Sequence, residues 1–316
     1  MGRSCEGLVA LVTGASQGGT GRSVAIRFAA EGAKVAITAR SEDGLAETLA
    51  RIEEVGGTGL VLPADLGDPA GGRATLVERT EAAFGPIDIL VNNAVAHALK
   101  PVHEWTIEEL EAYAQVNLWS PWLHTSQVLP GMRERGRGWI LNLTSFSGEL
   151  PPGPPFAFKA KDGSAMYGAT KAALNRLTVA AAGENEGLGV AVNALTPQCA
   201  ISTPRVQAGG LVSGAELFEP VETMAEAALV LCTGDPSTLT GRIAFSLQLL
   251  LELERPVYDL HGKELVDGWQ PADLVRVVRA QEEFHAGNGW PHAFDFHRVH
   301  TPRPAALDAE SELLTE

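Results

Sequence analysis

Short apolar runs alternate with longer, helix-spaced segments over roughly the first 250 residues of the chain. The runs are rich in Val, Ile, Leu and Ala, and their apolar positions are continuous rather than alternating. Runs of this kind are typical of strands that are buried on both faces. We therefore predict strands at Leu8–Thr13, Lys34–Ala39, Gly59–Pro63, Ile87–Asn92, Trp139–Thr144, Val190–Leu195 and, as a seventh, Ile243–Leu247.

The segments between these runs repeat their apolar residues at helical spacing. In one of them, Leu45, Leu49 and Ile52 share a helix face that lies opposite charged residues. Alternating strands and helices indicate βαβ units and a parallel sheet, which right-handed crossovers wind on both sides. The expected fold is therefore α/β, a doubly wound Rossmann-type sheet of about seven strands. Helices are predicted at Ser23–Ala30, Gly44–Val55, Pro69–Phe84 and Thr106–Arg133.

Two segments depart from this alternation. Pro151–Ala165 is too rich in proline and glycine to form a helix or an inner strand. The chain also continues well beyond the seventh predicted strand. We therefore expect a Rossmann-type domain at 1–251 and an arm-like C-terminal extension at 252–316, in which Pro271–His285 is predicted to be helical.

Composition and charge limit the kinds of binding partner and the cellular compartment that we expect for this chain. With 24 basic and 39 acidic residues, the chain has a net charge of −15, which argues against nucleic acid and anionic membrane as partners. The three cysteines, Cys5, Cys199 and Cys232, are far apart in sequence, so we expect no disulfide and a cytoplasmic location. No apolar run approaches the ~18 residues of a membrane span, and no signal peptide is recognised.

A glycine-rich stretch, Thr13–Gly21 (TGASQGGTG), joins the first predicted strand to the first predicted helix. Glycines at such a place permit a tight turn, and the helix N-terminus offers free N–H groups to a pyrophosphate. The strand-turn-helix context favours a dinucleotide site over a turn that only packs the helix against the strand.

The end of the second predicted strand bears on which dinucleotide binds. An acidic residue there would accept a hydrogen bond from the ribose 2′-hydroxyl of NAD. The chain instead places Arg40 there, and a guanidinium is well shaped for the 2′-phosphate of NADP. We expect NADP to be preferred, with NAD as the alternative. The competing interpretation is that Arg40 is a solvated residue at a strand end.

Tyr167 and Lys171 are four residues apart, which places them on one face of a helix. A phenol with a pKa near 10 is a poor acid–base group at neutral pH, and a nearby cation stabilises its phenolate form. Ser145 ends the fifth predicted strand, where ligands of doubly wound sheets bind. These three residues are therefore candidates for proton transfer to or from a substrate oxygen.

In its motifs the chain resembles the short-chain dehydrogenase/reductase family over about residues 7–250. Tyr-x-x-x-Lys alone occurs often by chance, but the order and spacing of the whole set are specific. The resemblance implies an NAD(P)-dependent oxidoreductase that acts on CH–OH donors as a homodimer or homotetramer. The motifs that carry it are TGASQGGTG, Asp65 in PADL, Asn92-Asn93-Ala94, Asn117 in YAQVN, Ser145 in LNLTS, and YGATK.

The resemblance also implies a catalytic set of Asn117, Ser145, Tyr167 and Lys171. In that set Tyr167 exchanges a proton with the substrate oxygen, which Ser145 orients. Lys171 lowers the pKa of Tyr167 and holds the nicotinamide ribose, and Asn117 helps to hold a water. Each residue also has a purely structural interpretation: a strand cap for Ser145, a half-buried helix position for Tyr167, and backbone pairing in a helix bend for Asn117.

The cofactor residues implied by the resemblance follow the same motifs. Asp65 is expected to contact the adenine, and Asn93 is expected to line the cofactor cleft. The full set is Gly14, Ser16, Gly19, Gly21, Arg40, Asp65, Leu66, Asn93, Ala94, Tyr167, Lys171, Pro197 and Thr203.

The chain departs from the family pattern in several places. Its glycine loop has one extra residue, which we place before Gly19. Val95 stands where the family has glycine, and a valine does not easily adopt a positive φ. Gln198 replaces the glycine after Pro197, so it is expected to alter contacts with the nicotinamide carboxamide. Thr203 is shifted by about one position.

The interval between Ser145 and Tyr167, 22 positions, is longer than the family norm because of the proline-rich segment. A long loop beside an active site is expected to form a substrate lid or wall. Its aromatic residues favour a hydrophobic substrate (steroid-like, polycyclic or acyl), unless they only pack the loop down. Candidate contacts are Trp119, Phe146, Phe156 and Phe158, and, from a second loop at Gln198–Pro220, Leu211, Leu217 and Phe218.

The extension is rich in histidine and aromatic residues. Its histidines, His261, His285, His292, His297 and His300, match no metal-binding spacing, so no metal is expected. We expect the arm to wrap its own domain or a neighbouring subunit, with anchors at Trp269, Trp290, Phe294 and Phe296.

The leading functional hypothesis is an NADP-preferring enzyme that interconverts a secondary alcohol and a ketone. Two alternatives stay open at this point. One is a cofactor-binding regulator or scaffold without turnover, and the other is a reductase for the carbon–carbon double bond of enones.

Overall fold

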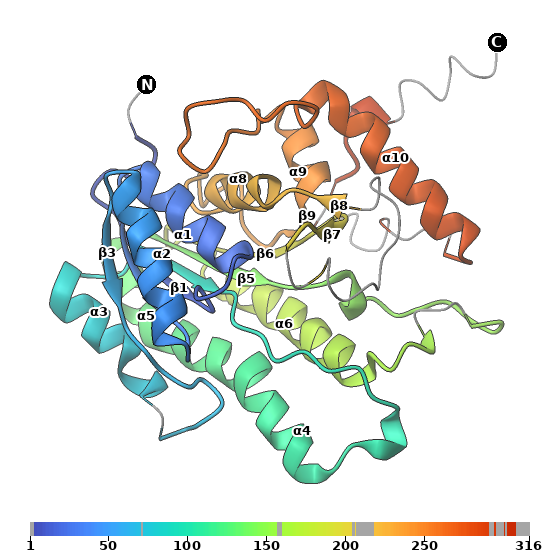
Figure 1. Ribbon diagram of the computed structural model, residues 1–316, viewed down its shortest axis with the longest axis horizontal. Coiled ribbons are helices and arrows are strands. Elements are labelled where there is room, and N and C mark those ends of the chain that lie inside the picture. The colour runs from blue at the N-terminus through green and yellow to red at the C-terminus, as the bar shows by residue number, and fades with distance from the viewer. Residues whose placement is uncertain are drawn as a thin grey trace.

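The computed structural model describes residues 3–70, 72–156, 160–203, 206, 218–290, 294, 300 and 302–307. Seven parallel strands form one sheet in the order β3-β2-β1-β4-β5-β6-β9, with helices on both faces (Figure 1). This confirms the predicted Rossmann-type α/β fold. The strands are β1 (Val9–Thr13), β2 (Lys34–Thr38), β3 (Thr58–Val61), β4 (Ile89–Asn92), β5 (Gly138–Leu143), β6 (Val190–Thr196) and β9 (Ile243–Phe245).

Successive side chains along a strand point to opposite faces of the sheet and so belong to two separate hydrophobic cores. Ala10 and Val12 of β1 belong to one core, whereas Val9 and Leu11 belong to the other. Because both faces are buried, the strands read as continuous apolar runs. One face is covered by α1 (Thr20–Ala30), α2 (Glu42–Glu54) and α8 (Val221–Leu231), and the other by α3 (Leu76–Phe84), α5 (Ser120–Arg135) and α6 (Ala165–Glu184).

One predicted helix was too long at its start, and another contains a π turn that was not predicted. The helix expected at Pro69–Phe84 begins as α3 only at Leu76, because Gly72 adopts a left-handed φ of +84° and a 3₁₀ turn follows it. The helix expected at Thr106–Arg133 is α4 (Ile107–Ala114) and α5, joined by a π-helical turn at Gln115–Trp119. Single π turns are frequently found at functional sites.

The seventh predicted strand was too long at its C-terminal end. It stops at Phe245, and Ser246–Glu252 forms α9 instead. The Ser246 hydroxyl donates to both carboxylate oxygens of the buried Glu219, at 2.9 and 2.8 Å. Glu219 lies in β8 (Phe218–Glu219), which pairs with β7 (Ala200–Ile201) in a small separate sheet. The hydrogen bonds between Ser246 and Glu219 hold the chain beside the small sheet, so β9 does not continue past Phe245.

The described part of the extension packs on its own domain. The helix predicted at Pro271–His285 is confirmed as α10 (Pro271–Gly287), which lies against α9 (Figure 1). The extension also contributes apolar side chains to the core beneath α1 and α8: Val257, Leu274, Val277, Val278 and Leu307. The extension therefore shares a core with the Rossmann-type domain.

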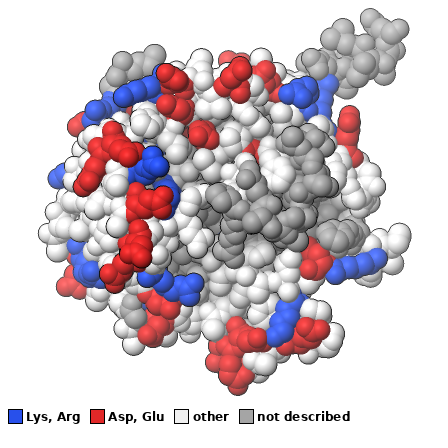
Figure 2. Space-filling view, in the orientation of Figure 1, with Lys and Arg blue, Asp and Glu red and all other residues white. Residues whose placement is uncertain are grey.

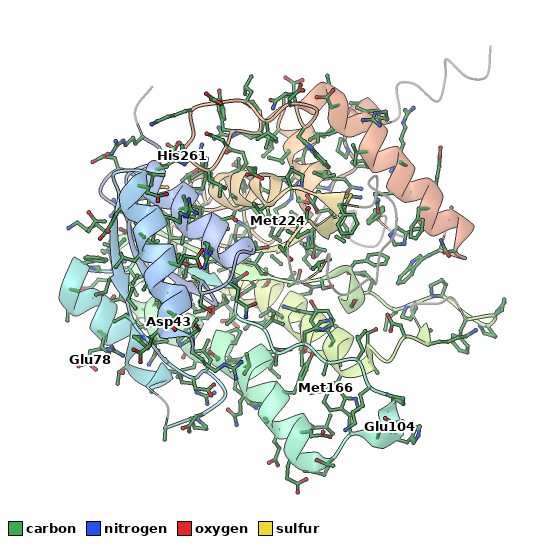
Figure 3. All side chains as sticks on the ribbon, in the orientation of Figure 1. Asp43, Glu78, Glu104, Met166, Met224 and His261 are labelled. Carbon is green, nitrogen blue, oxygen red and sulfur yellow. The ribbon has the colours of Figure 1, made fainter. Side chains whose placement is uncertain are left out.

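A buried ion network also ties the extension to the domain. Glu226 of α8 is fully buried and pairs with the buried Arg27 of α1 at 3.0 Å and with Arg255 of the extension at 2.6 Å. In Figure 3 the loop that carries His261 reaches over α8, the helix of Met224, toward α1. A Cβ at Gly262 would lie 2.6 Å from the Arg27 guanidinium, so this loop can approach only with glycine there.

The surface charges are of mixed sign. Figure 2 shows Lys and Arg interspersed with Asp and Glu over the face in view, without one continuous basic area among the described residues. No helix in the described part of the chain combines the length and the apolarity needed to cross a membrane.

Candidate active site

A cavity of about 590 Å³ opens at the carboxyl ends of β1, β2 and β4, where the strand order reverses. In doubly wound sheets this reversal is where dinucleotides bind. Three residues predicted to contact the cofactor, Tyr167, Lys171 and Pro197, are not part of the lining. The predicted residues that do line it are Gly14, Ser16, Gly19, Gly21, Arg40, Asp65, Leu66, Asn93, Ala94 and Thr203.

The glycine loop is held against the end of β4. Gly14 has a φ of +71°, and a Cβ there would lie 2.7 Å from the Ala94 Cα. Asn93 fixes the loop, because its Nδ2 donates to the carbonyls of Thr13 at 2.8 Å and Gly14 at 3.1 Å. The same amide would clash with any side chain at Gly21. Glycine is therefore required at 14 and 21 by packing within the protein.

The loop before Gly19, where we place the extra residue, turns outward. Gln17 and Gly18 are exposed, and the Gly19 N–H donates to the Gln17 carbonyl at 2.7 Å to close a tight turn. Arg22 holds the preceding backbone by donating to the Ser16 carbonyl at 2.9 Å. The insertion therefore bulges outward and leaves Gly19, the N-cap of α1, facing Thr203 across the cavity.

Two departures from the family pattern differ in how the structure accommodates them. Val95 lines the cavity, and Glu254 is the sole non-glycine with a positive φ among the described residues, so Val95 keeps an ordinary backbone. Gln198 is buried, and both polar atoms of its side-chain amide are without a hydrogen-bond partner in the described structure, which is energetically costly. Burial raises the pKa of the neighbouring Glu219 to about 7.

Arg40 is exposed at the rim of the cavity. Its side chain makes no hydrogen bond or ion pair with any described residue. The next residue, Ser41, caps α2 by accepting from the Gly44 N–H at 3.1 Å. Arg40 therefore lies beside a helix N-terminus, where an anion is favoured. Asp65 also lines the cavity, with one carboxylate oxygen accepting from the Gly67 N–H at 2.8 Å.

Two glycines bring the proposed acid–base residues together. A Cβ at Gly168 would overlap the Ser147 carbonyl, and one at Gly148 would lie 3.1 Å from the backbone of α6. Because neither glycine has a side chain, α6 lies directly on the turn that follows Ser145. Tyr167 and Lys171 belong to α6. This packing brings the Tyr167 phenol close to the Ser145 side chain, which acts to lower the pKa of the phenol.

Burial is the largest influence on the pKa values of Tyr167 and Lys171. It raises the pKa of Tyr167, and the interaction with the Ser145 side chain opposes that rise. Burial lowers the pKa of Lys171 to about 8. The Lys171 Nζ donates to the Leu143 carbonyl at 2.6 Å and lies 5.7 Å from the centroid of the Tyr167 ring. Lys171 is thus close to the phenol, and its expected effect on the Tyr167 pKa stays a prediction.

Asn117 lies in the π-helical turn, and its side chain is buried. Its Oδ1 accepts from the Ala96 N–H at 2.8 Å, and its Nδ2 donates to the Ala96 carbonyl at 2.9 Å. The structural interpretation of Asn117 therefore holds. Its role in a water relay stays a prediction.

The sequence reasoning missed His97. Its ring meets the Tyr167 ring edge-on, with centroids 4.9 Å apart. His97 lies in the loop after β4, four residues beyond Asn93, and no local motif marks it. Only the tertiary packing of that loop against α6 places it beside the phenol.

The predicted substrate-contact residues differ in their placement. Phe146 is half-buried beside Ser145, whereas Trp119 and Phe156 are exposed. Trp290 and Phe294 are buried anchors of the extension, and Trp269 packs against the core.

Among the described residues no cluster of His, Cys, Asp and Glu is suited to a metal. Predicted positions outside the described residues are Phe158, Leu211, Leu217, His292, Phe296 and His297.

Comparison with known proteins covers the Rossmann-type part of the chain. The profile of the short chain dehydrogenase family matches residues 8–208. The chain is 36% identical over 192 residues to the 3-oxoacyl-(acyl-carrier-protein) reductase FabG of Escherichia coli, covering 61% of this chain and 73% of that protein. It is 35% identical over 201 residues to 3beta-hydroxysteroid dehydrogenase 1 of Eggerthella lenta, covering 63% and 72%.

A solved structure agrees with these relatives. A metagenomic short-chain oxidoreductase in complex with NADP superimposes with a TM-score of 0.62 and 30% identity, covering 75% of this chain and 96% of that one. Together with the cavity at the strand-order reversal and the paired Ser145 and Tyr167, these likenesses identify the chain. It belongs to the short-chain dehydrogenase/reductase family of NAD(P)-dependent oxidoreductases.

Proposed function

We propose that this enzyme prefers NADP and interconverts a secondary alcohol and a ketone on a hydrophobic substrate. The observation that carries the cofactor preference is Arg40, an exposed guanidinium at the cavity rim with no partner among the described residues. Such a group pairs well with a phosphate. The solved NADP complex of a relative supports the same choice.

The proposed chemistry divides between cofactor and protein. The bound nicotinamide supplies or accepts the hydride. Tyr167 donates a proton from its phenol Oη to the carbonyl oxygen during reduction and takes it back during oxidation. Ser145 donates a hydrogen bond to the same oxygen and orients it. Lys171, held by the Leu143 carbonyl, supplies positive charge near the phenol, which favours phenolate.

A hydrophobic substrate is supported by the residues next to Ser145 and by the relatives. Phe146 directly follows Ser145 and is half-buried. Two relatives are named for oxidoreduction of a 3-oxoacyl group and of a 3β-hydroxysteroid, which both place the reacting oxygen on an apolar skeleton. Their shared feature, a carbonyl or hydroxyl on a hydrophobic body, is the substrate class we assign.

We also propose a cytoplasmic homo-oligomer. Trp119 and Trp122 are both about half exposed at the start of α5, as expected of an interface between copies. The three cysteines are free and buried, which fits a reducing compartment. Light scattering of the Trp122→Glu variant tests the assembly, and an unchanged oligomer would remove Trp122 from the interface.

Replacing Arg40 by Ala is expected to weaken NADPH binding roughly 10- to 100-fold, since a charge-assisted hydrogen bond contributes about 1.5–3 kcal/mol. NADH lacks the 2′-phosphate, so its dissociation constant is expected to stay within about twofold. Titration of nicotinamide fluorescence measures both constants.

The matched control is Arg51→Ala, which removes another exposed arginine of the same region, one that pairs with Glu54 at 3.2 Å. It is expected to change neither constant. Equal affinity of the Arg40→Ala variant and the unaltered protein for NADPH would refute the assigned role of Arg40.

A further inference from the structure

Five aromatic rings from three parts of the chain meet beside Ser145. They are Phe146, Phe245, His285, Trp290 and Phe294, which we call the aromatic clamp. The Phe146 ring centroid lies 4.5 Å from that of Trp290, 4.8 Å from His285 and 5.6 Å from Phe294. Phe294 also meets Phe245 at 5.0 Å and His285 at 5.2 Å. Three of the five rings belong to the C-terminal extension.

The clamp is fixed to the sheet on one side and to the active site on the other. Phe245 is the last residue of β9 and pairs in register with Thr196 of β6. Phe146 begins the turn that follows Ser145. In that turn the Ser145 Oγ accepts from the Ser147 N–H at 3.2 Å, and the Gly148 N–H donates to the Ser145 carbonyl at 2.8 Å. Phe146 is therefore joined to Ser145 by a single peptide bond, within a turn that hydrogen bonds of Ser145 close.

The rings of the extension are well packed. Trp290 and Phe294 are 3% and 6% exposed, and Phe245 is 2% exposed. Aromatic pairs at these centroid distances contribute about 0.5–1.5 kcal/mol beyond the area they bury. Rings packed against one another have fewer accessible rotamers, so the clamp limits the positions open to the Phe146 ring.

We propose that the C-terminal extension holds Ser145 in its working position through Phe146, which makes His285, Trp290 and Phe294 positioning residues of the active site in the same chain. This inference rests on the proposed function, in which Ser145 orients the substrate oxygen. The proposal gives the C-terminal extension a role in positioning Ser145. The extension lies beyond the matched family profile, which ends at residue 208.

Precise placement of Ser145 matters because a shift of about 1 Å in a catalytic group can cost roughly 100-fold in rate. The Ser145 side chain also acts to lower the pKa of Tyr167, so a displaced serine changes the setting of both residues. The NADP cavity is lined by other elements and does not include the clamp. Loosening the clamp should therefore lower kcat while leaving cofactor binding intact.

Point variants in the full chain test this better than truncation, because removing the extension would expose core residues such as Val257 and Leu274. We choose Phe146→Ala, Trp290→Ala and the conservative Trp290→Phe. The matched control is Phe284→Ala, since Phe284 precedes His285 on α10 but is 44% exposed, and among the described rings it meets only His285. Thermal melts confirm that each variant is folded at the assay temperature.

Reduction of aryl ketones and of 9,10-phenanthrenequinone by NADPH gives the kinetic readout. Phe146→Ala and Trp290→Ala are expected to lower kcat by roughly 10- to 100-fold, with the NADPH dissociation constant within twofold. Trp290→Phe should restore most of the rate, and Phe284→Ala should match the unaltered enzyme. Unchanged kcat in folded Phe146→Ala and Trp290→Ala variants would overturn the proposal.

A second readout does not depend on turnover. The chain has three tyrosines, so labelling with ¹³C at tyrosine Cζ gives three NMR signals, and Tyr167→Phe assigns one of them. We expect Phe146→Ala to move the Tyr167 signal and to leave that of Tyr258 in place. If no carbonyl compound is reduced, the proposed function fails, and this signal alone decides the clamp: an unmoved Tyr167 signal in Phe146→Ala refutes it.

Discussion

Replacing Tyr167 with Phe is expected to lower kcat by at least 100- to 10,000-fold, the range that a positioned general acid or base contributes. The substitution removes only the phenol oxygen and keeps the ring that packs against His97. Ser145 and Lys171 remain, but neither can deliver a proton with the same geometry. The NADPH dissociation constant should change little, because Tyr167 does not line the dinucleotide cavity.

Steady-state kinetics together with NADPH fluorescence titration measure both quantities. Tyr258→Phe is the matched control, because Tyr258 lies in the extension and is bridged to Leu265. It should leave kcat unaltered. A Tyr167→Phe enzyme that retains more than a tenth of the original kcat would show that another group transfers the proton.

The second large effect concerns stability. Glu226→Ala is expected to reduce the free energy of unfolding by about 3–5 kcal/mol, the usual result of removing one partner from a buried ion pair. Glu226 is fully buried and pairs with Arg27, which is 2% exposed, and with Arg255 of the extension. The substitution leaves the Arg27 guanidinium buried with Glu31 as its remaining acidic partner among the described residues.

Urea unfolding followed by circular dichroism measures this loss. Glu54→Ala provides the comparison, since the Arg51–Glu54 pair is more than half exposed, and such pairs contribute about 0–1 kcal/mol. A loss below about 1 kcal/mol in Glu226→Ala would mean that the network does not hold the extension to the domain.

Much of the fold could be predicted because buried parallel strands leave a clear pattern. The strands from Leu8 to Leu195 were placed within a few residues, and α10 within two. The errors occurred where tertiary contacts override local pattern. Ser246 leaves the strand for α9 because its hydroxyl binds the buried Glu219, a residue 27 positions away. The helix predicted at Thr106–Arg133 was placed within two residues, but apolar spacing does not reveal the π turn that joins α4 to α5.

The dinucleotide cavity was also predictable, because its contacts come from motifs that follow strands. The glycine loop, Arg40, Asp65 and Asn93 all meet there. Phe146 was predicted as a substrate contact, but neither His97 nor the packing of Phe146 against the extension could be predicted. His97 reaches Tyr167 only through the packing of a loop, and Phe146 meets Trp290 across 144 sequence positions (290 − 146). The close approach that glycine permits at 148 and 168 is likewise visible only in three dimensions.

Tracing the hydride tests the central claim most directly. The enzyme is incubated with NADPH deuterated at C4, on one face and then on the other, and with a set of aryl ketones and an aryl enone. Products are then analysed by mass spectrometry and NMR. The proposed function predicts an alcohol with one deuterium on the carbinol carbon, from one face only, and loss of this product in Tyr167→Phe. Deuterium at the β-carbon of the enone, or in no product, would contradict it.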